Sequence, residues 1–145
     1  QLDQTLDSFD PYPDLLPTND GPKTLAGLRK NICVGIAYMH GWNTGLGCVA
    51  WDDLMEDLAT LEISRTQTWQ WLSHQIQLDD GVNVTPELVG QIFTEELKKI
   101  IDEIEPHNPN SQKLISEFEQ ACKDAADIFT ESKFREFLTT FSEIE

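Results

Sequence analysis

Basic residues are scarce in this chain of 145 residues. Ten lysines and arginines stand against 26 aspartates and glutamates, so the formal net charge at pH 7 is −16. An excess of negative charge repels phosphate backbones, and we therefore do not expect nucleic acid as a partner. Clustered acids usually form a solvated face, which is our interpretation of Glu95, Glu96, Glu103, Glu105, Glu143 and Glu145.

The sequence also lacks long apolar runs and paired cysteines. Cys33, Cys48 and Cys122 show neither zinc-site nor disulfide spacing, which fits reduced thiols in an intracellular protein. The three histidines lack the spacing of metal ligands as well. No apolar run approaches the roughly 20 residues of a membrane span, and the first residues do not resemble a signal peptide. These absences predict a soluble protein with no membrane contact and no metal of its own.

Prolines divide the chain into an arm and a helical domain. Four of the seven prolines lie in residues 1–22, which we interpret as an extended arm or a former interdomain linker. Residues 23–145 carry apolar side chains at the three- and four-residue steps of amphipathic helices. Alternating strand patterns are almost absent. The predicted fold class is therefore all-α, a single bundle of about five helices with an extended proline-rich N-terminal arm.

Capping residues predict where the helices begin. Asp53 is suited to cap the second helix, because its side chain can accept from the backbone N–H of Met55 or Glu56. Pro86 suits the first position of the third helix, whose cap is Thr85. The five predicted helices begin at Thr24, near Asp53, at Thr85, at Asn110 or Ser111, and at residue 130, the last one ending at residue 142.

Several short motifs run through the middle of the chain. They are Gly27-Leu28-Arg29-Lys30-Asn31-Ile32, Gly45-Leu46-Gly47-Cys48, Leu54-Met55-Glu56-Asp57, Ile63-Ser64-Arg65 and Leu78-Asp79-Asp80-Gly81. Over roughly half of the chain, this pattern resembles the C-terminal segment of the malate synthase family. In that family a helical domain covers the mouth of a TIM barrel, which holds the glyoxylate and magnesium sites. Because a TIM barrel needs about 250 residues, the resemblance implies the C-terminal domain alone.

Asp57 aligns with the family's catalytic base, which takes a proton from the methyl carbon of acetyl-CoA. A thioester α-carbon is a poor acid, so a base must be held against it while the enolate oxygen is stabilised. Spacing alone favours another interpretation, an acid in the first turn of a helix, where the macrodipole favours negative charge. We expect Glu56 to point elsewhere, because adjacent helical residues diverge by about 100°. Asp52, Asp53, Glu56 and Asp57 lack the EF-hand spacing, so we expect no metal site among them.

The loop before this helix supplies further candidate contacts. Gly45 and Gly47 would permit close backbone approach to the acyl-CoA arm. Cys48 aligns with a cysteine near the thioester pocket, although a buried structural thiol is an alternative interpretation. The resemblance therefore implies that Gly45, Gly47 and Cys48 contact acetyl-CoA. Arg65 is expected to pair with Glu62 one helical turn earlier, as a structural contact.

Two hypotheses for function follow from the resemblance. In the first, the chain is the C-terminal domain of a malate synthase, inactive by itself, and supplies the base that condenses acetyl-CoA with glyoxylate to malate and CoA in the glyoxylate cycle. Magnesium and acetyl-CoA would bind the complete enzyme, the TIM barrel would be the partner, and the chain alone would bind no cofactor and would associate weakly with itself. In the second, it is a non-catalytic helical interaction module derived from this family. The proline-rich arm favours this hypothesis, and so do Ala50 and Trp51, which depart from the family pattern as Leu58 also does.

The resemblance leaves the compartment open. Family members work in the cytoplasm or in peroxisomes and glyoxysomes, and the sequence given ends in Ser142-Glu143-Ile144-Glu145, not in Ser-Lys-Leu. We therefore expect an intracellular location without import through that signal.

Overall fold

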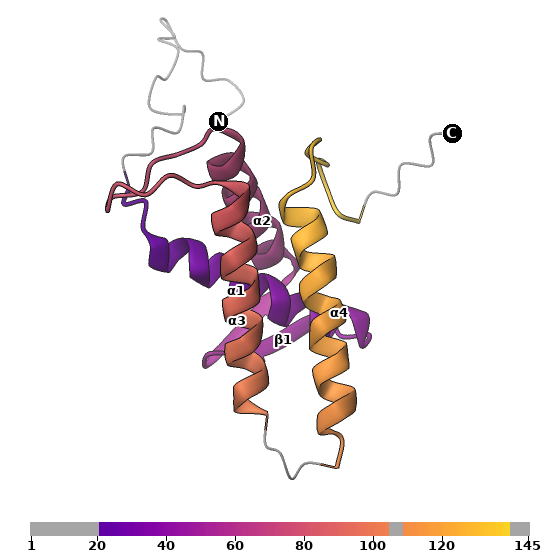
Figure 1. Cartoon of the computed structure of the whole chain (residues 1–145). Coiled ribbons are helices and arrows are strands. Elements are labelled where there is room, and N and C mark those ends of the chain that lie inside the picture. Colours follow the sequence, from indigo (N-terminus) through magenta and orange to yellow (C-terminus); the bar gives the residue numbers. More distant parts are fainter. Residues whose placement is uncertain (1–20, 105–108, 140–145) are drawn as a thin grey trace, which may run out of the picture.

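The computed structural model describes residues 21–104 and 109–139. Within these ranges the chain is mostly helical, with one small antiparallel hairpin (Figure 1). The elements are α1 (Leu25–Asn43), β1 (Cys48–Trp51), β2 (Leu54–Asp57), α2 (Leu58–Ser73), α3 (Pro86–Glu103) and α4 (Ser111–Phe129). The predicted helical bundle is confirmed. The predicted arm lies almost entirely outside the described residues.

Helix α1 is the centre of the bundle and contacts the other three helices. It begins as predicted, with Thr24 Oγ1 accepting from the backbone N–H of Gly27 at 3.0 Å. The sequence pattern placed its apolar residues on one face. The structure instead buries α1 on several sides, and Val34, Ile36 and Tyr38 are all inside. These contacts on several sides place α1 in the middle of the bundle.

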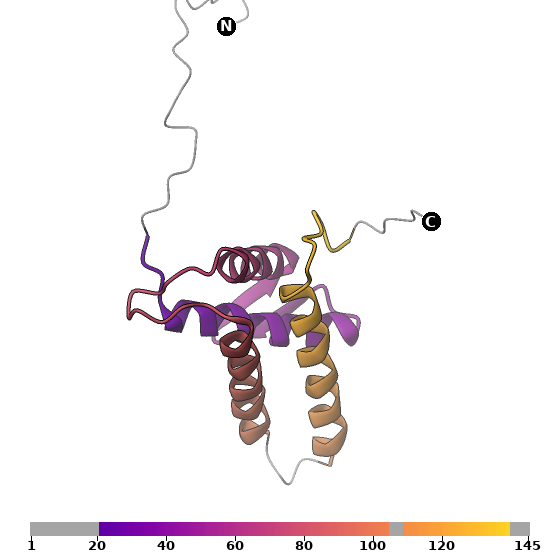
Figure 2. The same cartoon turned by 45° about the horizontal axis from the view of Figure 1, so that its top comes forward.

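Helices α3 and α4 lie side by side, and α1 crosses one end of the pair (Figure 2). Both begin where the caps predicted: Thr85 Oγ1 accepts from the N–H of Leu88 at 3.2 Å, and Asn110 precedes α4. The crossing is close, because a Cβ on Gly35 would lie 2.5 Å from the ring of Phe129. Glycine therefore allows α1 to approach α4.

An ionic cluster fastens α3 to α1. Arg29 donates to Glu95 at 2.5 Å and to Glu96 at 2.8 Å, and Lys99 also pairs with Glu96 at 2.7 Å. Hydrogen bonds from Gln91 and Arg29 lower the pKa of Glu95. The expectation that Glu96 faces water is wrong: its carboxylate is buried and satisfied by two cations.

The predicted fifth helix is also wrong. Residues 131–139, which we call the strap, contain no helix and run across α2. Side chains of α2 satisfy the strap's backbone: Arg65 donates to the carbonyl of Arg135 at 2.8 Å, and Glu62 accepts from the N–H of Leu138 at 2.8 Å. Tertiary bonds therefore replace the helical ones that the apolar spacing suggested. The predicted pairing of Arg65 with Glu62 is confirmed at 2.6 Å.

Candidate functional site

The predicted second helix begins later than expected, because a hairpin occupies residues 48–57. Asp52 and Asp53 form its two-residue turn with φ of 48° and 62°, the left-handed conformation typical of a type I′ turn. Lys30 pairs with Asp52 at 2.5 Å and tethers this turn to α1. Asp53 is therefore a turn residue and not the cap of a helix. Leu54 and the residues after it have helical apolar spacing, but the turn at Asp52 and Asp53 directs them into a strand that pairs with β1.

The hairpin packs tightly on the last turns of α1. A Cβ on Gly41 would lie 2.1 Å from Val49 Cγ1, so only glycine permits this contact. The loop between α1 and β1 is fixed as well, since the N–H of Leu46 donates to the carbonyl of Gly41 at 2.8 Å. Helix α1 thus determines where the hairpin lies.

Asp57 is the last residue of β2 and the N-cap of α2. Its Oδ1 accepts from the backbone N–H groups of Ala59 at 2.9 Å and Thr60 at 3.3 Å. Within the described ranges, no hydrogen bond reaches Oδ2, and the residue is exposed. One carboxylate oxygen therefore orients the side chain while the other stays accessible to a ligand.

Glu56 and Asp57 point to opposite faces of the hairpin, because side chains alternate along a strand. Glu56 is buried and Asp57 is exposed. The conclusion that these two acids do not share a pocket is confirmed, although strand alternation and not helical rotation is the reason.

The structure brings Cys48 directly opposite Asp57 in the hairpin register. Cys48 is exposed, which contradicts the alternative of a buried structural thiol. Gly45 and Gly47 lie in the adjoining loop, and a Cβ built on either would meet no atom within 4 Å. Gly45 has a φ of +88°, so its turn requires glycine for conformational reasons. The three predicted contacts therefore lie in or next to the loop that leads to Asp57.

Tyr38 belongs to this site and was missed by sequence reasoning. Its side chain is fully buried, and its hydroxyl donates to the carbonyl of Gly47 at 3.0 Å. Burial, together with the charges of Asp57 and Cys48, raises the pKa of Tyr38 above its usual value. In the sequence, Tyr38 lies outside the apolar spacing that predicted α1. The contact forms because the loop after α1 turns back onto that helix, which the sequence pattern of α1 does not indicate.

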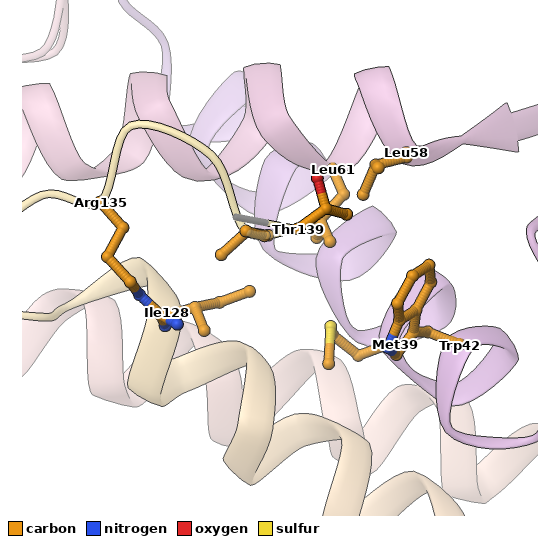
Figure 3. A pocket seen from close by; sticks show the side chains of 8 residues that line it. Met39, Trp42, Leu58, Leu61, Ile128, Arg135 and Thr139 are labelled. Atoms are coloured by element: carbon orange, nitrogen blue, oxygen red, sulfur yellow. The ribbon is translucent and has the colours of Figure 1, made fainter. Parts of the chain in front are cut away.

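An apolar cavity of about 270 Å³ opens next to the first turn of α2 (Figure 3). Leu58, which follows Asp57 directly, forms one wall with Leu61. The other walls come from three different parts of the fold: α1, α4 and the strap, through Met39, Trp42, Ile128, Arg135, Leu138 and Thr139. Leu58, which departs from the family pattern, therefore lines a cavity.

Trp51, another departure from that pattern, packs against Phe118 of α4, with the two ring centroids 6.3 Å apart.

The described residues contain no group of three or more histidine, cysteine or acidic side chains arranged to hold a metal ion. In the same ranges, no helix combines the length and the apolar character needed to cross a bilayer. The candidate chemistry of the site is thus that of an exposed carboxylate beside a glycine-containing loop and an apolar cavity.

Comparison with known proteins identifies the family. The family model described as malate synthase, C-terminal, matches residues 22–143. Malate synthase A of Escherichia coli is 40% identical over 125 residues, which is 86% of this chain and 23% of that protein. Glyoxysomal malate synthase of Brassica napus is 40% identical over 129 residues, 87% of this chain and 22% of the relative. The bifunctional glyoxylate cycle protein of Caenorhabditis elegans is 37% identical over 127 residues, which is 88% of this chain and 12% of that protein.

The chain therefore spans less than a quarter of the length of these relatives. It belongs to the malate synthase C-terminal domain family.

Proposed function

We propose that this chain supplies the catalytic base of a malate synthase, and that Asp57 is that base. Asp57 takes a proton from the methyl group of acetyl-CoA, and the resulting enolate carbon bonds to the aldehyde carbon of glyoxylate. Water then cleaves the thioester of malyl-CoA, giving malate and CoA. The observation that carries the proposal is the accessible Oδ2 of Asp57 on a carboxylate whose Oδ1 is held by two backbone amides.

The capping bonds suit a base that must meet a weakly acidic carbon. They fix the side-chain torsions of Asp57 before any ligand arrives, so little conformational freedom is lost on binding. In this chain the carboxylate is exposed to water. A second domain that covers it would remove water and make the carboxylate more basic. The proposed partner is therefore the TIM-barrel domain of the complete enzyme.

Exposed apolar side chains near the site favour such a partner. Trp42, Leu46, Leu54 and Met55 are large apolar residues that remain about half exposed or more, Met55 at 68%. All four lie on the hairpin, its loop or the end of α1. We propose that they contact the barrel, and that without it they cause weak self-association measurable by sedimentation.

The barrel would also supply what the described residues lack. We assign glyoxylate and magnesium to it, because no cluster suited to a metal is present in the described ranges. Gly45, Gly47 and Cys48 are the proposed contacts of acetyl-CoA on this chain.

The proposed domain division follows the same assignment: residues 23–145 are the domain that carries the base, and residues 1–22 are the connecting arm. Some relatives are named glyoxysomal and another is malate synthase A of Escherichia coli, so we propose either the glyoxysome or the cytoplasm as the location.

Mixing the purified chain with a separately expressed malate synthase barrel tests this function. CoA release from acetyl-CoA, glyoxylate and magnesium is expected from the mixture and not from the chain alone. Asp57→Asn should abolish the activity without unfolding the chain, since asparagine also caps helices. Asp53→Asn is the matched control: it makes the same chemical change on the same hairpin and should keep the activity.

A non-catalytic interaction module is the second candidate, favoured by exposed apolar residues away from the hairpin. Ile63 and Phe137 are 68% and 59% exposed. If the chain binds the barrel and Asp57→Asn leaves CoA release unchanged, the catalytic proposal is wrong and this candidate stands. Activity of the chain alone would contradict the division of the site between two domains.

A further inference from the structure

The apolar cavity beside α2 is closed at its base and open at one side. Leu61, which lines it, is only 2% exposed, whereas the lining residues Trp42, Arg135 and Thr139 are exposed. The opening therefore lies between the end of α1 and the strap (Figure 3). Pockets for cofactors and other small ligands usually measure about 300–1,000 Å³. At about 270 Å³ the cavity is smaller than these and suits one large side chain.

The chemistry of the walls favours an apolar occupant. Among the described residues that line the cavity, Arg135 is the charged one, and its Nε already donates to Glu131 Oε2 at 2.9 Å. Its charge therefore does not require an anionic ligand. The arm of a CoA thioester contains amide groups, which would lose hydrogen bonds to water here and find few partners. A hydrocarbon side chain has no polar atoms to pair.

Trp42 connects the cavity with the exposed apolar patch that consists of Trp42, Leu46, Leu54 and Met55. Trp42 is 49% exposed and also forms part of the cavity wall. Its ring lies beside that of the fully buried Tyr38, with centroids 6.5 Å apart, which supports Trp42 in this position. A surface that covers the patch therefore reaches the opening of the cavity. Binding energy in protein interfaces concentrates where a large side chain fills such a pocket.

Charge argues against a second copy of this chain as the covering surface. Each copy carries a formal net charge of −16, so two copies repel one another and self-association is expected to be weak. We propose that the cavity receives one large apolar side chain of the barrel domain. This inference rests on the proposed docking of that domain over Asp57. Leu58 lines the cavity and follows Asp57 directly, so the inserted side chain would fix the barrel next to the base.

Ile128→Trp tests this role, because it fills the cavity from its α4 wall. Isothermal titration calorimetry would measure the affinity of the purified chain for a separately expressed barrel. We expect Kd to rise about tenfold or more, since the loss of a central interface side chain has effects of this size. The melting temperature of the chain alone should not fall, because the indole adds apolar contacts inside an existing cavity.

Ile63→Trp is the matched control. It makes the same change on α2, at a residue that is 68% exposed and lies outside the cavity. Its Kd should equal that of the unchanged chain. Equal Kd values for Ile128→Trp and Ile63→Trp would overturn the inference. If the unchanged chain does not bind the barrel, or if Asp57→Asn keeps full activity, the proposed function itself fails, so the failures are distinguishable.

Thr139→Arg keeps the test decisive should Ile128→Trp be too unstable to assay. Thr139 is exposed at the opening, so an arginine there places a charge at the entrance without disturbing the core. Ser132→Arg makes a similar change at another exposed position of the strap, outside the cavity. A higher Kd for Thr139→Arg than for Ser132→Arg supports an apolar side chain in the cavity, and equal values overturn the inference.

Phe141→Ser tests whether residues that follow the strap are the occupant instead. If Phe141 filled the cavity, this substitution would lower the melting temperature of the unchanged chain but not that of Ile128→Trp, in which the cavity is already filled. We expect no such difference. Its appearance would assign the cavity to the chain's own residues and overturn the inference.

Discussion

Replacing Arg65 with methionine tests whether polar contacts with α2 hold the strap in place. The Arg65 side chain is fully buried, pairs with Glu62 at 2.6 Å and lies 4.4 Å from the centre of the Phe134 ring. Removing one partner of a buried ion pair costs about 3–5 kcal/mol. Glu62 keeps 19% of its side-chain surface exposed and so retains part of its hydration. We therefore expect Arg65→Met to lower the free energy of unfolding by about 3 kcal/mol, the lower end of that range.

Urea and thermal unfolding measure this loss. For a chain of this size the expected fall in melting temperature is about 6–12 °C. The indole N–H of Trp69 gives a local signal, because it donates to the carbonyl of Glu131 on the strap. In Arg65→Met, its hydrogen exchange should become faster under conditions where the rest of the chain stays folded.

Arg29→Met is the control for the loss of a paired arginine. Arg29 is partly exposed, and Lys99 still pairs with Glu96 after the substitution. Arg29→Met should lower the free energy of unfolding by about 1 kcal/mol or less, as for other partly exposed ion pairs. If Arg65→Met costs no more than Arg29→Met, the strap does not depend on the buried arginine and the reasoning is refuted.

Four further predictions concern the hairpin and the thiols. Gly41→Ala should cost about 1–3 kcal/mol in thermal unfolding, because its Cβ would lie 2.1 Å from Val49 Cγ1; an unchanged melting temperature would contradict this contact. Asp53→Gly should stabilise by up to about 1 kcal/mol, because glycine adopts a φ of 62° freely; a lower urea midpoint is the opposing result. Burial raises the pKa of Cys122 to about 11 from 9.0, so its contribution to stability falls as pH rises between those values. Iodoacetamide at pH 8 should label exposed Cys48 first and Cys122 only on unfolding, and early labelling of Cys122 would contradict its burial.

Helices with strong local signals were predictable from the sequence. Thr24, Thr85 with Pro86, and Asn110 all mark helix starts that the structure confirms. The strap was not predictable, because its conformation depends on Arg65 and Glu62, which lie more than 60 residues away in the chain. Apolar spacing alone cannot report bonds of this kind.

The hairpin was missed for a local reason. Leu54, Met55 and Glu56 favour helices, and an Asp-Asp pair is a less usual type I′ turn than Asn-Gly. Asp57 was found only through the resemblance, because spacing alone identified it as an acid at the start of a helix. The structure corrects that interpretation by one position, because Asp57 is the N-cap that precedes α2 and not a residue of its first turn.

The capping role and the proposed catalytic role of Asp57 require the same geometry. Contacts with the end of α1 fix the hairpin, through Gly41 against Val49 and through Tyr38 below Gly47. The Asp57 carboxylate is then oriented by the first turn of α2. None of these contacts needs a second domain, so the site is formed before the proposed barrel binds. Docking therefore loses little conformational freedom in ordering the site, and the exposed apolar residues around it are free to contribute to affinity.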